Sequence, residues 1–122
     1  VLFVDDEESI LDIARTYFSE HGYRVLTASN GRKAVEILWN NRIDCCFTDI
    51  NMPEMDGLHL LHYLRQTPQT AKVGFLLITG RADPDIIERG RKLGMNNFLK
   101  KPFEPAGLKT AIEAIVYASN RW

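Results

Sequence analysis

The sequence has few cysteines, no long apolar run and no excess of one charge, and each shortage excludes a class of protein. The only cysteines, Cys45 and Cys46, are adjacent in an apolar run. Consecutive strand side chains point to opposite faces, so neither a disulfide framework nor a zinc site is expected. No stretch approaches the roughly eighteen apolar residues of a membrane helix, and the chain opens on a strand-like run rather than a signal peptide. The 15 basic and 16 acidic residues nearly balance, which gives no electrostatic reason for direct binding to nucleic acid or a membrane. We expect one domain in a reducing cytoplasm.

Short apolar runs alternate with amphipathic segments along the whole chain. Five runs rich in β-branched and aromatic residues predict strands at 1–4, 23–28, 43–48, 73–79 and 97–100. After each run the apolar residues recur at helical spacing, and in the first segment Ile10, Ile13, Ala14, Tyr17 and Phe18 share one face. Gly22 and Gly94 follow the first and fourth helical segments, and Pro105 opens the fifth. The pattern is strand then helix, five times.

Strands separated by helices need crossover connections, so the sheet should be parallel and covered by helices on both faces. This predicts an α/β, doubly wound three-layer fold that spans residues 1–122 as one domain. Residues 117–122 are either the end of the last helix or the start of a connection to another part. In such folds ligands bind beyond the carboxyl ends of the strands, so the residues there are the candidates for a site.

Polar residues follow four of the five predicted strands. They are Asp5 and Asp6, then Asp49, then Thr79, then Lys101. Carboxylates crowded together repel one another unless a cation lies among them, and oxygen ligands without histidine or thiolate favour Mg²⁺. A carboxylate beside such an ion, with a lysine opposite, is equipped to accept a phosphoryl group. The alternative for each residue alone is ordinary: an acidic pair after a strand is often a helix cap, and an aspartate often starts a loop.

Four segments resemble the motifs of response-regulator receiver domains. Residues 1–6 resemble the apolar strand and acidic pair that open these domains, and 49–57 resemble the phosphoacceptor loop D-x-x-M-P-x-x-x-G. Residues 78–80 are similar to the hydroxyl-bearing end of their fourth strand, and 99–103 to their lysine-proline turn. Together the segments cover essentially the whole chain in the same order and spacing.

The resemblance implies a flavodoxin-like sheet of strand order 2-1-3-4-5 and a site for Mg²⁺. Asp6 and Asp49 would bind the ion directly, Asp5 mainly through water, and Asn51 through its backbone carbonyl. Asp49 would be the phosphoacceptor, and its donor would be a histidine kinase or a histidine phosphotransfer protein. The domain would be regulatory rather than an enzyme that turns over a substrate, although it would support its own phosphotransfer and slow self-dephosphorylation.

Further roles follow from the same resemblance. Lys101 would contact the phosphoryl oxygens, and its peptide bond to Pro102 is expected to be cis. Thr79 would donate its hydroxyl to a phosphoryl oxygen. Gly57 is expected to supply a backbone conformation that other residues resist.

Signalling in the family couples the hydroxyl-bearing residue at the end of the fourth strand to an aromatic residue on the fifth strand. In this chain these residues would be Thr79 and Phe98. Receivers often have tyrosine there, and phenylalanine can swing inward but cannot donate a hydrogen bond. The alternative is that Phe98 is a partly exposed strand residue without a switching role. The output surface would be the fourth helix, fifth strand and fifth helix, acting through a homodimer or an output domain whose nature the sequence does not indicate. Asn51 and Arg81 would border the path of the attacking water, and we hypothesise that Arg81 shields the phosphoryl group.

Three other functions remain as alternatives. A haloacid-dehalogenase-type phosphohydrolase also forms an aspartyl phosphate, but it carries a second acid where this chain has Asn51, and a cap domain. A flavodoxin-like FMN binder needs a hydroxyl- and glycine-rich loop after the first strand, where this chain has four consecutive acidic residues. The third alternative is a receiver-like module that binds partners without being phosphorylated.

Overall fold

The computed structural model describes residues 1–50, 56–80, 83–101 and 103–119, the last four of them by their backbone alone. Within these ranges, five strands and five helices alternate along the chain. The strands are β1 (Leu2–Val4), β2 (Leu26–Ala28), β3 (Cys45–Asp49), β4 (Gly74–Thr79) and β5 (Asn97–Lys100). The helices are α1 (Glu8–Glu20), α2 (Gly31–Asn40), α3 (Gly57–Gln66), α4 (Pro84–Leu93) and α5 (Pro105–Ser119).

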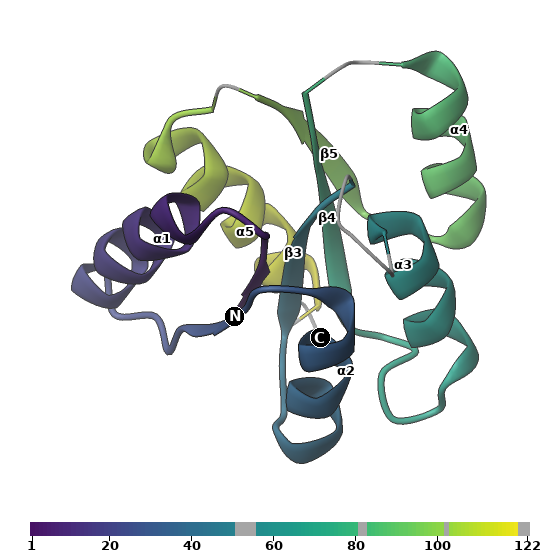
Figure 1. Ribbon diagram of the computed structural model, residues 1–122, viewed down its shortest axis with the longest axis horizontal. Helices are drawn as coiled ribbons and strands as arrows, with labels where there is room; N and C mark the ends of the chain where they lie inside the picture. The colour runs from purple at the N-terminus through teal and green to yellow at the C-terminus, as the bar shows by residue number, and fades with distance from the viewer. Residues whose placement is uncertain (51–55, 81–82, 102, 120–122) are drawn as a thin grey trace.

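The strands form one parallel sheet in the order β2-β1-β3-β4-β5. Figure 1 shows the sheet between two layers of helices, with α1 and α5 on one side and α2 and α3 on the other. The predicted three-layer fold and its strand order are therefore confirmed. The β2 ladder starts later than expected, because only its last three residues pair with β1.

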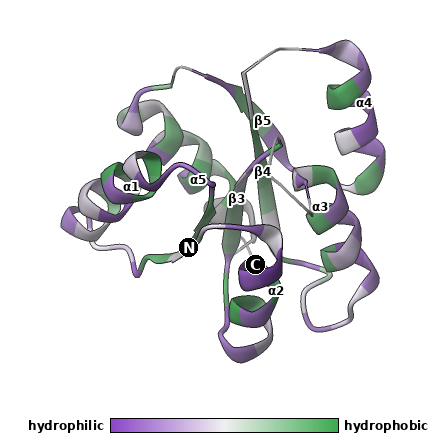
Figure 2. Ribbon diagram, in the orientation of Figure 1, coloured by the Kyte–Doolittle hydropathy of each residue, from purple (hydrophilic) through white to green (hydrophobic). Residues whose placement is uncertain are grey.

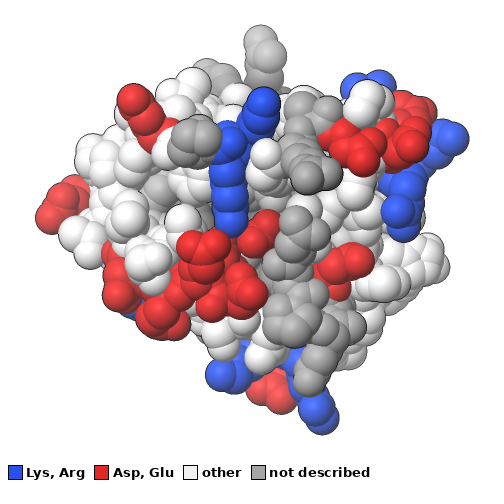
Figure 3. Space-filling model, turned by 45° about the horizontal axis from the view of Figure 1, so that its top comes forward, with Lys and Arg blue, Asp and Glu red and all other residues white. Residues whose placement is uncertain are grey.

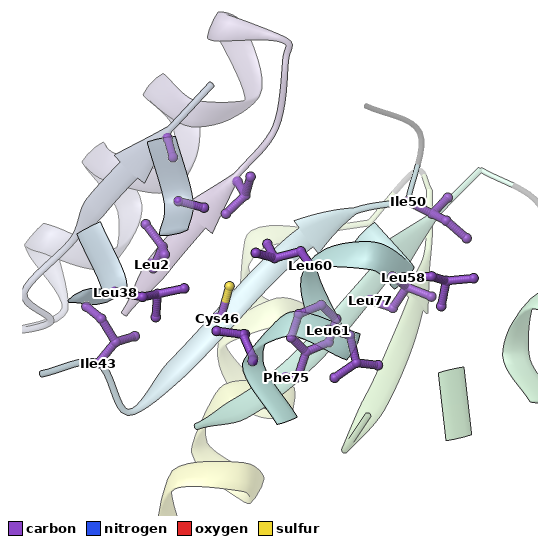
Figure 4. Close-up of a cluster of buried hydrophobic side chains, with 14 residues drawn as sticks. Leu2, Leu38, Ile43, Cys46, Ile50, Leu58, Leu60, Leu61, Phe75 and Leu77 are labelled. Carbon is purple, nitrogen blue, oxygen red and sulfur yellow. The ribbon is translucent and has the colours of Figure 1, made fainter. Parts of the chain in front are cut away.

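Buried apolar side chains cover both faces of the sheet. Figure 2 shows the strands as largely hydrophobic and the helices as a mixture of hydrophilic and hydrophobic residues. One cluster lies between the sheet and α2, α3 and α4, and Figure 4 shows part of it, including Leu60, Leu61 and Phe75. The other lies between the sheet and α1 and α5, and includes Phe18 and Ile112. Burial of this apolar surface on both faces is the main term that stabilises the fold.

The adjacent cysteines of β3 lie on opposite faces of the sheet. Cys46 belongs to the cluster beneath α2 and α3, and Cys45 belongs to the cluster beneath α1 and α5. Both are free and fully buried. Burial raises the pKa of Cys45 to about 12, and it also raises the pKa of Cys46. Both thiols are therefore neutral core residues, as the alternating strand pattern predicts.

The buried stripe of α1 differs by part of a turn from the expected apolar face. Leu11, Ala14 and Phe18 are buried, whereas Ile13 is 54% exposed. Ile13 lines an apolar groove between α1 and α5, so its side chain lies at the rim of the interface rather than in the core. Within the described ranges, none of the helices is long and apolar enough to span a bilayer.

Candidate functional site

Backbone hydrogen bonds continue past the ends of the strands and fix the residues that follow them. The Asp5 amide donates to the Ala28 carbonyl at 3.1 Å, which extends the pairing of β1 with β2. The Lys101 amide donates to the Thr79 carbonyl at 2.7 Å, which extends the pairing of β5 with β4. Because the strands are parallel, all these residues lie at one edge of the sheet.

Three carboxylates meet at this edge. One oxygen from each of Asp5, Asp6 and Asp49 lies within 4.8 Å of the others. Asp5 and Asp49 are buried, at 2% and 6% exposure, while Asp6 is exposed. Figure 3 shows acidic side chains gathered next to a column of basic ones on this face. The oxygen-only donor set and its mixed burial fit a hard divalent cation that keeps some of its water.

The Lys101 ammonium reaches into the carboxylate cluster. Its Nζ lies 3.1 Å from Asp49 Oδ2 and 3.4 Å from Asp5 Oδ2. Burial lowers the pKa of Lys101, but its hydrogen bond to Asp49 and the charge of Asp5 outweigh this, so the net shift is upward. These contacts therefore favour the charged form of Lys101 and hold it against the candidate acceptor.

Burial also raises the pKa of Asp5, an effect only partly offset by the Glu7 amide and the Lys101 ammonium. Ionised together, the three carboxylates would leave these four side chains with an excess of two negative charges, and Asp5 lies where solvent cannot screen it. A bound dication would remove this excess.

The helix-cap alternative for the acidic pair is wrong, because neither Asp5 nor Asp6 is the N-cap of α1. Asp5 Oδ1 accepts a hydrogen bond from the Glu7 amide at 2.9 Å, which shapes the turn before α1. Its other oxygen faces Lys101. The N-cap residue of α1 is Glu7, whose own side chain makes no capping bond. Asp5 thus supports the local turn and also contributes to the carboxylate cluster.

Gly57 is required for a reason other than the expected one. The positive φ angles among the described glycines belong to Gly22 and Gly94, so the expectation of an unusual conformation at Gly57 is wrong. Gly57 begins α3 directly against the end of β3. A Cβ there would lie 2.9 Å from the Asp49 carbonyl oxygen and 3.1 Å from Ile50 Cα. A side chain at this position would push on the backbone of the candidate acceptor.

Of the remaining candidates, two are described and three are not. Thr79 is buried at the end of β4, and its register partner on β5 is Lys100. Phe98 is half-buried and packs against the cluster on the α2, α3 and α4 side. Asn51, Arg81 and Pro102 lie outside the described residues, so their predicted roles and the cis peptide bond stay predictions.

Comparison with known proteins gives one consistent family. The family model of the response regulator receiver domain matches residues 1–113. The chain is 34% identical over 116 residues to a probable chemotaxis protein CheY of Rhizobium etli, covering 94% of this chain and 90% of that protein. It is also 34% identical over 122 residues to the response regulator SaeR of Staphylococcus aureus, but spans only 52% of that protein's length.

Solved structures agree with these relatives. The chemotaxis protein CheY4 of Vibrio cholerae superimposes with a TM-score of 0.90 at 31% identity, covering 93% of this chain and 95% of that one. The receiver domain of a Pseudomonas aeruginosa sensor histidine kinase, solved with a magnesium ion in its active-site cleft, gives a TM-score of 0.85 at 26% identity, covering 95% of each chain. Since the family model covers almost all of the chain and the sheet has the order of these structures, the chain belongs to the response regulator receiver domains of two-component signalling.

Proposed function

We propose that this domain accepts a phosphoryl group on Asp49 from a phosphohistidine donor in a reaction that depends on Mg²⁺. The donor would be a histidine kinase or a histidine phosphotransfer protein. The observation that carries the proposal is the position of the Lys101 ammonium, 3.1 Å from Asp49 Oδ2 inside a cluster of three carboxylates. A cation held against one carboxylate, beside two others suited to a metal, is the arrangement that phosphoryl transfer to an acid requires.

Asp6, Asp49 and the backbone carbonyl of Asn51 would hold the ion directly, with Asp5 acting mainly through water. When bound, Mg²⁺ would supply positive charge that offsets the negative charge of the phosphoryl group during its transfer. An Asp49 carboxylate oxygen attacks phosphorus while the bond to the donor imidazole breaks. Lys101 balances charge on the transferred group, and the Thr79 hydroxyl donates to one of its oxygens. Arg81, two residues after Thr79, would shield the product and slow its hydrolysis.

Signalling would follow from movement of Thr79 toward the phosphoryl group and of Phe98 into the space it leaves. Two observations support this path. Thr79 and Phe98 lie on adjacent paired strands, with Phe98 opposite Leu77. Phe98 also packs into the cluster that α4 helps to cover. The surface of α4, β5 and α5 would then change, and a homodimer or an attached output domain would respond.

The domain would extend over residues 1–122. Helix α5 continues to Ser119, so a connection to another part would begin beyond that residue rather than near residue 117. This chain spans 52% of the length of SaeR, so that relative has a further part beyond the matched region, and an attached output part in the present protein would be in keeping with this. We propose a cytoplasmic location, in keeping with the free thiols of Cys45 and Cys46.

The test is modification by acetyl phosphate, followed by intact-protein mass spectrometry with Mg²⁺ and with a chelator. The wild type should gain one phosphoryl group only with Mg²⁺, and Asp49→Asn should gain none. The matched control is Asp44→Asn, which removes the same charge just before β3 begins, at the opposite edge of the sheet. It should be modified as the wild type is. Full modification of Asp49→Asn would overturn the proposal, and an unmodified wild type would favour a receiver-like binding module.

A further inference from the structure

Arg65, in the last turn of α3, joins three parts of the chain through its guanidinium group. Nη1 donates to the Val73 carbonyl at 2.6 Å and to the Ala71 carbonyl at 3.1 Å. Nη2 and Nε donate to the Gly94 carbonyl at 2.9 and 3.1 Å. Nη2 also lies 3.4 Å from Asn96 Oδ1. All these acceptors are neutral carbonyl oxygens, and hydrogen bonds from a charged donor to such groups are stronger than neutral ones.

The acceptors hold the carboxyl end of α4 in place. Gly94 caps the helix with φ of 100°, and a Cβ there would lie 3.0 Å from Arg65 Nε, so glycine permits both the turn and the close approach. Asn96 then attaches the chain to β4: its amide donates to the Phe75 carbonyl at 2.9 Å, and its side chain accepts from the Phe75 amide at 2.7 Å. Helix α4 is thereby tied at this end to α3 and to the start of β4.

The amino end of α4 is held differently. Asp83 caps it with its own side chain, which accepts from the Asp85 amide at 2.9 Å, a bond internal to the segment. Pro84 and Asp85 are exposed, and of the whole helix, which is described throughout, only Gly90 is buried. Figure 1 shows α4 beside α3 at the margin of the molecule. Ile86 packs against the core cluster at this end, as Leu93 does at the other, so the difference between the two ends lies in the hydrogen bonds from Arg65 to the carboxyl end. Segments with fewer fastening contacts open at lower free energy, so the amino end is the more easily displaced.

We propose that Arg65 is the pivot of α4. It fastens the carboxyl end of the helix, so that displacement produced by modification of Asp49 is concentrated at the amino end, which follows Thr79 in the chain. The second half of this proposal rests on the proposed function, because it requires Asp49 to be modified. The first half concerns the unmodified protein.

Amide hydrogen exchange measured by NMR at each end of α4 tests both halves. The reporters for the carboxyl end are Gly94 and Met95, whose amides donate to the carbonyls of Arg91 and Gly90, and the reporter for the amino end is Ile87, whose amide donates to the Asp83 carbonyl. In the unmodified protein, Arg65→Met should speed exchange at Gly94 and Met95 by about tenfold or more, and at Ile87 by less than about twofold. Arg65→Lys keeps the positive charge but lacks the planar guanidinium group that donates to several carbonyls at once. It should give an intermediate increase in the exchange rate at Gly94 and Met95.

The matched control is Arg91→Met, on the last turn of α4, where the arginine makes an exposed ion pair with Glu88. It should change exchange at the reporter amides by less than about twofold. An Arg65→Met protein that exchanges at Gly94 and Met95 as the wild type does would overturn the pivot.

Beryllofluoride with Mg²⁺ tests the second half. In the wild type, exchange should change by threefold or more at Ile87 and much less at Gly94 and Met95, whereas in Arg65→Met both ends should change. An equal or larger change at the carboxyl end of the wild type would overturn the pivot, as would bound beryllofluoride with no change at either end. Failure of beryllofluoride to bind would instead count against the proposed function, and the exchange rates of the unmodified variants would still decide whether Arg65 fastens the helix.

Discussion

The same substitution, glycine to alanine, should have opposite effects at two helix starts of this domain. At Gly57 the new Cβ would lie 2.9 Å from the Asp49 carbonyl oxygen, 3.0 Å from Leu77 Cδ1 and 3.1 Å from Ile50 Cα. Two of these atoms belong to the backbone, which cannot rotate away as a side chain can. At Gly107, near the start of α5, nothing lies within 4 Å of the added Cβ.

Overpacking of a well-packed region costs about 1–3 kcal/mol, so Gly57→Ala should lower the free energy of unfolding by that amount. For a domain of this size, the loss corresponds to a fall in Tm of about 4–12 °C. Gly107→Ala should instead gain about 0.5 kcal/mol, because alanine restricts the unfolded chain and favours the helix without a clash.

Urea unfolding of the wild type and both variants measures the two free energies, and titration with beryllofluoride and Mg²⁺ measures the site. Gly57→Ala should also bind beryllofluoride more weakly at a temperature where it is fully folded, since the clash displaces the backbone of Asp49. The packing argument would be refuted by a Gly57→Ala protein as stable and as reactive as the wild type. A loss of stability in Gly107→Ala equal to that in Gly57→Ala would refute it too, since the effect would then not depend on the contact.

Two further predictions concern the charged site and the buried thiols. Lys101→Met should slow phosphorylation of Asp49 by acetyl phosphate by roughly 10²–10³-fold, the usual cost of removing a positioned cation or donor. Lys100→Met, which changes the exposed neighbouring residue, should leave the rate near that of the wild type. Equal rates for both variants would contradict the role of Lys101. Burial raises the pKa of Cys45 to about 12 and also raises the pKa of Cys46. Above about pH 9 the unfolded chain therefore releases thiol protons that the folded chain retains. As the pH rises through this range, the free energy of unfolding should fall by up to about 1.4 kcal/mol per pH unit per thiol. Urea unfolding from pH 8 to 10 measures this slope, which should be smaller in a variant with alanine at both positions; an equal slope would show that other groups carry the pH dependence.

The sequence was sufficient to predict the sheet and the carboxylate cluster because both depend on local patterns. Alternation of short apolar runs with helical segments specifies parallel strands, and parallel strands bring Asp5, Asp49 and Lys101 to one edge wherever each ladder begins. The starts of the strands were less accurate, because residues 23–25 have strand-like composition but precede the first pair of the β2 ladder. Pairing depends on the neighbouring strand, which local composition does not contain.

The interactions that the sequence did not predict all depend on tertiary distances. The requirement for glycine at position 57 comes from how closely α3 approaches β3. Arg65 binds backbone carbonyls up to 29 residues away, and a carbonyl acceptor leaves no sign in the sequence because every residue has one. Ile13 fits the helical period as well as its neighbours do, and only the position of α5 leaves it at the rim of a groove.

The charges at the site connect these features to the proposed reaction. Lys101 lies between the buried carboxylates of Asp5 and Asp49 and offsets part of their mutual repulsion. Asp6 and Asp49 would hold the dication, whose positive charge would offset the same repulsion, and Lys101 could then direct its ammonium toward the phosphoryl oxygens. Because the Lys101 amide is bound to the Thr79 carbonyl, the start of the lysine side chain stays fixed while its end changes partner. At the acceptor, the proposed reaction therefore involves rotation of the Lys101 side chain and the shift of Thr79, and we expect the larger displacement at the more weakly held amino end of α4.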